Sequence, residues 1–195
     1  MIASKGIKPR LMATEKGRAE TDPHAWQNPV NVMVCARNIA GSIAKVGPAG
    51  AAVYQANAET YVKELQSLDA ETNAQFAAIP PDKRKVITSH DAFGYFGARY
   101  QIRFLAPLGV STDSEPSARQ VALLIRQIQH EKIKAVFVEN MGSPRLLAQL
   151  SKDAGATVGP AQFVDALSAP GGPAGTYLSL IRHNAMQLAA GMRLN

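Results

Sequence analysis

Four short runs of β-branched and aromatic residues, each followed by a segment with helical periodicity, constrain the fold of this chain most. They lie after Pro80 and Pro81, at 85–89, 102–107, 134–139 and within 156–164. Strand–helix alternation of this kind is typical of a parallel sheet covered by helices on both faces. We therefore expect an α/β fold with a parallel sheet and flanking helices over residues 80–195.

A long helical pattern precedes the expected sheet. Large side chains recur mostly at helical spacing over about 49–78, so that they form one stripe, at Tyr54, Tyr61, Leu65, Leu68 and Phe76. At about 1.5 Å per residue this helix would span about 45 Å, more than a small domain needs. A second helix is predicted over 31–44, and the polar stretch 13–21 is interpreted as an exposed loop.

The charge pattern gives little support to nucleic-acid binding. The chain carries 21 Lys and Arg against 15 Asp and Glu, a net charge of +6. These basic residues are scattered rather than clustered, with few aromatic residues between them, which favours a solvated basic surface. No nucleic-acid partner is expected.

Candidate metal ligands follow the predicted strands. In open α/β sheets, ligands bind outside the carboxyl ends of the strands. The side chains found there are His90, Asp113, Glu115, Glu139 and Asp165. Imidazole and carboxylate together suit zinc, manganese or iron. Spacing alone leaves ordinary alternatives open, since His90 and Asp165 could equally be capping or turn residues.

Neither nucleotide binding nor acyl transfer has its usual signature. The chain contains no GxGxxG or GxxxxGK[ST] segment and no GxSxG segment. One further imidazole is held in a restrained setting, because His24 directly follows Pro23 and lies two residues before Trp26.

Five segments in order resemble the metal-binding solute-binding proteins of bacterial ABC importers, the zinc and manganese group (cluster A-I). They are "DPHAWQNP" at 22–29, "VITSHDAFGYF" at 86–96, "GVSTDSEPSA" at 109–118, "VFVENMGSPRL" at 136–146 and "FVDALS…GPAGTY…RHN" at 163–184. The resemblance implies two α/β lobes joined by a long rigid helix, with the metal in the cleft between them. It implies a binding protein and not an enzyme.

The resemblance also implies the ligands and the partners. His24, His90 and Asp165 match metal ligands, and Glu115 matches a residue that orients a ligand imidazole. Two imidazoles favour Zn²⁺, with Mn²⁺ as the alternative. The implied role is capture of the metal in the periplasm for delivery to an ABC permease.

The chain departs from the family pattern at its start. The family pattern begins with a signal peptide and a complete amino-terminal lobe. We expect this chain to contain only a remnant of that lobe, at 1–47, and no signal peptide. A linking helix is expected at 48–79 and a carboxyl-terminal metal-binding lobe at 80–195. Three of four ligands are then present, and the identity of the fourth is open. Surface that the missing lobe would cover is expected to promote self-association.

Two alternatives remain open at this stage. A zinc-dependent hydrolase would use metal-bound water with Glu115 or Glu139 as general base. A truncated remnant would fold but bind no metal.

Overall fold

The computed structural model describes residues 2–13, 19–88, 91–105, 117–137 and 144–195. The strands are β1 (Leu11–Ala13), β2 (Ala19–Thr21), β3 (Lys85–Thr88), β4 (Arg103–Leu105), β5 (Ala135–Phe137) and β6 (Thr157–Val158). The α-helices are α1 (Pro29–Val46), α2 (Ala51–Ala77), α3 (Gly94–Tyr100), α4 (Ala118–Glu131), α5 (Pro144–Ala154) and α6 (Tyr177–Met192). Short 3₁₀ helices are η1 (Ala25–Gln27), η2 (Pro48–Gly50) and η3 (Pro81–Lys83).

A parallel four-stranded sheet confirms the predicted fold class. Its strand order is β4-β3-β5-β6, and Ile87 of β3 pairs with Leu105 of β4 and with Val136 of β5. Successive side chains of a strand point to opposite faces. Ile87 accordingly packs with α4 and α5, whereas Val86 packs in the core formed with α2, α3 and α6. Both faces of the sheet are therefore covered.

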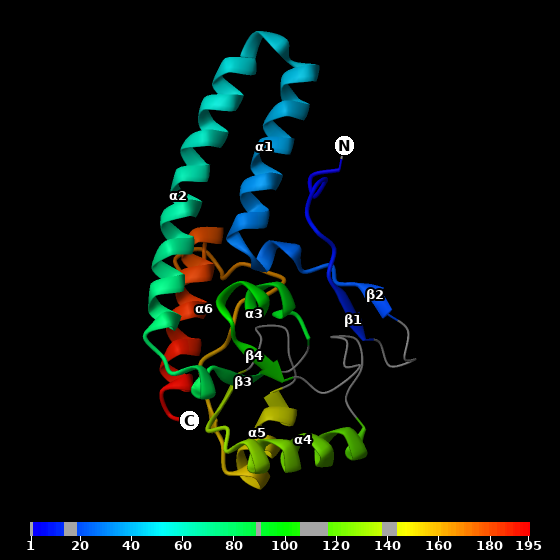
Figure 1. The fold of residues 1–195 in the computed structure, drawn as a ribbon, viewed down its shortest axis with the longest axis vertical. Helices are drawn as coiled ribbons and strands as arrows, with labels where there is room; N and C mark the ends of the chain where they lie inside the picture. Colours follow the sequence, from blue (N-terminus) through cyan, green and yellow to red (C-terminus); the bar gives the residue numbers. More distant parts are fainter. Residues whose placement is uncertain (1, 14–18, 89–90, 106–116, 138–143) are drawn as a thin grey trace.

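The two helices before the sheet form a long antiparallel hairpin that extends past the rest of the molecule (Figure 1). Asn28 caps α1 through its Oδ1, which accepts a hydrogen bond from the Val30 N–H at 3.0 Å, and Pro29 occupies the first turn. The amino-terminal segment runs beside α1, where the Asn38 amide donates to the carbonyls of Ala3 and Lys5.

The segment interpreted as an exposed loop contains strand residues at both ends, so that interpretation was wrong in part. Leu11–Ala13 pairs antiparallel with Ala19–Thr21, and residues 14–18 lie outside the described residues. The Asp22 N–H donates to the Arg10 carbonyl at 2.8 Å and extends the pairing. Backbone pairing can hold this pair together without the apolar alternation that makes a strand visible in sequence.

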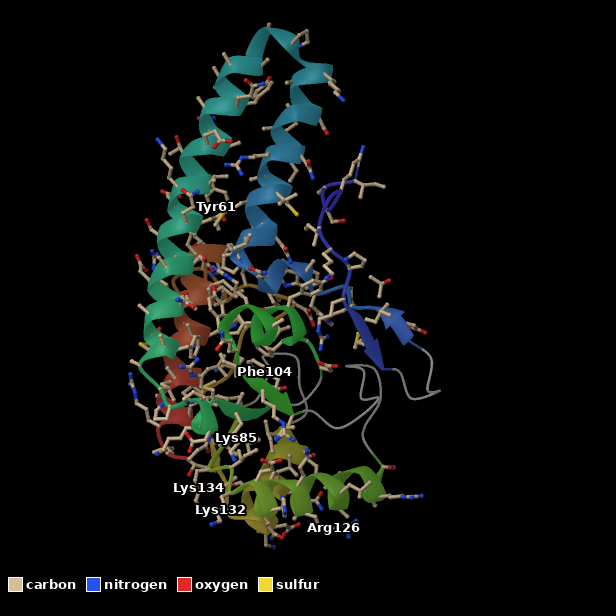
Figure 2. The ribbon with its side chains drawn as sticks, in the orientation of Figure 1. Tyr61, Lys85, Phe104, Arg126, Lys132 and Lys134 are labelled. Atoms are coloured by element: carbon tan, nitrogen blue, oxygen red, sulfur yellow. The ribbon has the colours of Figure 1, made fainter. Side chains whose placement is uncertain are left out.

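An aromatic cluster fixes α3 against α2 and the sheet. Phe93 stacks on Phe104 of β4 with 4.9 Å between ring centroids, and Phe96 meets Phe76 and Tyr100 edge to face. Phe104 lies on β4 near α3 (Figure 2). The start of α3, which follows the segment that contains His90, is thus held rigidly in the core. No helix among the described residues is both long and apolar enough to cross a membrane.

Candidate metal centre

His24 lies between β2 and α1, in a segment that restrains its imidazole. The side chain is nearly buried, with 8% of the residue surface exposed. Its Nδ1 lies 2.8 Å from Asp22 Oδ1, and its backbone N–H donates to the same oxygen at 2.9 Å. The rings of His24 and Trp26 are arranged edge to face, with 5.5 Å between centroids. The ring orientation is therefore set by contacts on two sides.

Asp165 approaches the other nitrogen of this ring. Its Oδ1 lies 3.9 Å from His24 Nε2, too far for a direct hydrogen bond. A zinc ion with ligands at about 2.0–2.2 Å places the ligand atoms of a tetrahedral site about 3.4 Å apart. The observed 3.9 Å is about 0.5 Å longer than that separation. Their chemistry and spacing fit a shared divalent cation.

Hydrogen bonds hold the segments of His24 and Asp165 together. The indole N–H of Trp26 donates to the Val164 carbonyl at 3.2 Å, and the Tyr177 hydroxyl donates to the Trp26 carbonyl at 2.7 Å. The Asn184 side chain on α6 makes two hydrogen bonds with the Phe163 backbone. Its Oδ1 accepts one from the Phe163 N–H, and its Nδ2 donates one to the Phe163 carbonyl. The backbone that leads to Asp165 is thereby fixed to α6 and to η1.

The other predicted site residues lie outside the described residues. These are His90 and Glu115, together with Asp113 and Glu139. Within the described ranges, three or more His, Cys, Asp or Glu side chains do not gather where they could hold a metal ion. The structure thus brings together His24 and Asp165. The assignment of His24, His90 and Asp165 as ligands, and of Glu115 as a residue that orients a ligand imidazole, stays a prediction.

The remaining described histidines lie in ordinary structural settings. His183 Nε2 is 3.2 Å from the Ala161 carbonyl oxygen, and its ring meets Phe163 edge to face. His130 is exposed in the last turn of α4. The contacts of His183 agree with a structural role, and the exposure of His130 agrees with a solvated residue at the helix end.

Asp22 and Arg10 adjoin the candidate site although the sequence analysis did not single them out. The Asp22 side chain is fully buried, and the Arg10 guanidinium donates to its Oδ2 at 2.8 Å. Burial acts to raise the pKa of Asp22, but hydrogen bonds from His24 and Arg10 outweigh it and hold the pKa below its ordinary value. The position of an aspartate two residues before His24 could have indicated the role of Asp22. Nothing in the sequence indicated that Arg10 would contact Asp22.

Comparison with known proteins defines the class. Residues 1–191 match the family described as the periplasmic zinc-uptake complex component A (ZnuA), and the chain belongs to this family. Related proteins include a metal ABC transporter substrate-binding lipoprotein, ScbA, of Streptococcus cristatus at 28% identity and the iron-binding protein YfeA of Yersinia pestis at 31% identity. Each alignment covers 97% of this chain and 61% of the relative, so the chain spans about three fifths of their length.

Solved structures give the same class. A manganese-bound periplasmic metal binding protein from Candidatus Liberibacter asiaticus superposes with a TM-score of 0.87 at 26% identity, covering 98% of this chain and 70% of that one. A structure of TroA superposes with a TM-score of 0.89 at 29% identity, covering 98% and 73%. These relatives are substrate-binding and metal-binding proteins, which confirms the expectation of a class that is not enzymatic.

Proposed function

We propose that this chain binds a divalent transition metal as the cargo of an ABC importer, with His24, His90 and Asp165 as ligands. The observation that carries the proposal is the approach of His24 Nε2 to Asp165 Oδ1 at 3.9 Å, between two segments remote in sequence. Membership of the zinc-uptake family supports metal as the cargo. Glu115 is assigned to orienting a ligand imidazole rather than to binding the metal itself.

Zn²⁺ is the proposed cargo, with Mn²⁺ as the alternative. Two imidazole nitrogens and one carboxylate form a donor set that suits zinc better than a set made only of oxygen. The names of the relatives span the possible metals: the family is named for zinc, YfeA for iron and PsaA of Streptococcus anginosus for manganese. The relative affinities of this chain for zinc, iron and manganese test the choice of Zn²⁺.

The proposed partner is a membrane permease, and the proposed location is outside the cytoplasmic membrane. Both proposals rest on the family's periplasmic description and on relatives named as ABC transporter substrate-binding lipoproteins. A restrained ligand suits this role, since a fixed imidazole loses little conformational freedom when it binds the ion.

Isothermal titration of metal-free protein with Zn²⁺, Mn²⁺ and Fe²⁺, the last under anaerobic conditions, tests the proposal. We expect one site with Zn²⁺ bound most tightly. His24→Ala, His90→Ala and Asp165→Ala should each weaken binding by at least about 100-fold, more than the loss of a residue that only orients a ligand.

His130→Ala is the matched control, because it removes an exposed imidazole on α4. Its affinity should equal that of the wild type. Unchanged affinity in the three ligand variants would refute the site, and tighter binding of Mn²⁺ would refute the choice of zinc. Lack of binding by the wild-type chain would leave a folded remnant that does not bind metal.

A further inference from the structure

The candidate ligand His24 is the inner end of a line of contacts that begins at the exposed side of Arg10. The Arg10 guanidinium donates to Asp22 Oδ2 at 2.8 Å, and Asp22 Oδ1 lies 2.8 Å from His24 Nδ1. The Arg10 side chain is 35% exposed, whereas the side chains of Asp22 and His24 are 0% and 10% exposed. The Asp22 carboxylate thus joins a cation to an imidazole in a nearly dry setting.

The hydrogen bond with Asp22 favours one tautomer of the His24 imidazole. Asp22 Oδ1 already accepts the His24 backbone N–H at 2.9 Å, so the aspartate is fixed relative to the backbone of the residue that it orients. A carboxylate can only accept hydrogen bonds, and His24 Nδ1 must therefore carry the hydrogen. In the neutral ring the lone pair is then on Nε2, the nitrogen directed at Asp165.

Arg10 is itself seated on the start of α3. A Cβ added at Gly94 would lie 2.0 Å from Arg10 Nη1 and 2.1 Å from its Cζ, so the guanidinium lies directly against the Gly94 backbone. The Arg10 backbone N–H donates to the Tyr95 hydroxyl at 2.8 Å, and that hydroxyl contacts the Lys8 carbonyl. Arg10 is thereby positioned by α3, the helix that follows His90 in the sequence.

We infer that Arg10 and Asp22 are positioning residues that hold His24 with Nε2 ready for the metal, and that the bare backbone of Gly94 provides the seat for Arg10. This inference rests on the proposed function for its metal. The orientation of the His24 ring is a property of the protein without metal. Arg10 and Asp22 connect His24 to the start of α3.

The first test reads the tautomer of His24 in metal-free protein. Long-range ¹H–¹⁵N spectra, recorded above the pH at which the His24 signals stop changing, should show hydrogen on Nδ1 in the wild type. The His24 signals are identified by their absence in His24→Gln. Asp22→Ala should shift the ring toward the Nε2–H tautomer. Arg10→Ala should give a mixture, and Arg10→Lys, which restores the charge, should return the wild-type signal.

The second test measures affinity for Zn²⁺ in the same variants. Asp22→Ala should weaken binding by about 10–100-fold and Arg10→Ala by about tenfold. Gly94→Ala should displace the guanidinium and reproduce the loss seen in Arg10→Ala. Arg10→Ala and Gly94→Ala both act through the contact between Arg10 and Gly94. The variant that carries both changes should therefore bind Zn²⁺ no more weakly than either single variant. Arg37→Ala, which breaks the exposed pair with Glu59 on the hairpin, is the control and should bind like the wild type.

Each outcome decides a separate point. If wild-type protein binds zinc while Asp22→Ala keeps both its Nδ1–H signal and its affinity, the inference is overturned. If only Arg10→Ala and Gly94→Ala behave like the wild type, the role of Arg10 is overturned and that of Asp22 stands. If wild-type protein binds no metal, the proposed function fails, and the tautomer spectra alone decide whether Asp22 and Arg10 orient the ring. Should Asp22→Ala fail to fold, Gly94→Ala and the two Arg10 variants decide the inference.

Discussion

Burial determines how two tyrosines of this chain respond to alkali. Tyr100 is almost fully buried, and its hydroxyl donates to Asp69 Oδ1 at 3.0 Å. Burial, reinforced by the nearby carboxylate of Asp69, raises the pKa of Tyr100 far above its ordinary value. Burial likewise raises the pKa of Tyr177, whose hydroxyl donates to the Trp26 carbonyl next to the candidate site.

We predict that the free energy of unfolding decreases in alkali because of these two residues. A tyrosine whose pKa is higher in the folded chain contributes stability that is intact below its unfolded pKa of about 10 and declines as the pH rises above it. Absorbance at 295 nm should therefore show two tyrosines that ionise only as the protein unfolds, followed in parallel by circular dichroism.

Substitution identifies the residues responsible. Tyr100→Phe and Tyr177→Phe should each remove amplitude from the ionisation phase that coincides with unfolding. Ionisation of all five tyrosines before any loss of helical signal would contradict the prediction.

At the scale of elements, two carboxylates of α2 make ion pairs of different kinds. Asp69 is buried and receives Nε and Nη2 of Arg99 on α3 together with the Tyr100 hydroxyl. Glu71 makes an exposed pair with Arg182 on α6, with 3.1 Å between Arg182 Nε and Glu71 Oε2. The same helix is thus joined to one neighbour by a buried network and to another by a solvated pair.

We predict unequal costs when these pairs are broken. Asp69→Ala leaves the buried Tyr100 hydroxyl without its acceptor, and we expect it to lower the free energy of unfolding by about 2–3 kcal/mol. Glu71→Ala removes a screened surface pair and should cost less than about 1 kcal/mol. Urea unfolding of both variants measures the difference. Equal losses would show that the buried Asp69 network does not stabilise the packing of α2 on α3 more than a surface pair does.

At the scale of the whole molecule, the helical hairpin carries apolar side chains into solvent. Ile39, Ile43 and Val46 recur at helical spacing on α1 and are 37%, 45% and 89% exposed. The exposed residues of α2 are mostly polar or alanine, with Val53, 59% exposed, as a large apolar exception. Contiguous exposed apolar surface promotes association.

We predict that this stripe of Ile39, Ile43 and Val46 supports self-association. Sedimentation velocity should show mass that increases with protein concentration, and the variant carrying Ile39→Ser and Ile43→Ser should remain monomeric. Met186→Ser removes a similarly exposed apolar side chain from α6 and serves as control. A wild-type chain that stays monomeric at about 100 μM would exclude contact energies stronger than about 5 kcal/mol.

Local periodicity made most of the fold predictable. Helices were expected over 31–44 and about 49–78, and α1 and α2 occupy Pro29–Val46 and Ala51–Ala77. The four expected strands are present as β3 to β6, though shorter within the described residues. Side-chain spacing repeats at 3.6 residues in a helix and 2 in a strand, so such elements are encoded within a few consecutive residues. The strands β1 and β2 were not predicted, because strands of three residues are too short to show a periodic pattern.

The sequence by itself determined the class of this protein: the strand–helix order, the long helix and the motifs around His24 and Asp165 identified its family. Only the tertiary structure decided which atoms meet. The 3.9 Å approach of His24 to Asp165, the burial of Asp22 and the seat of Arg10 on Gly94 all join segments distant in the chain. Such contacts depend on how whole elements pack, because the cost of closing a long loop is recovered only through the combined burial of many residues.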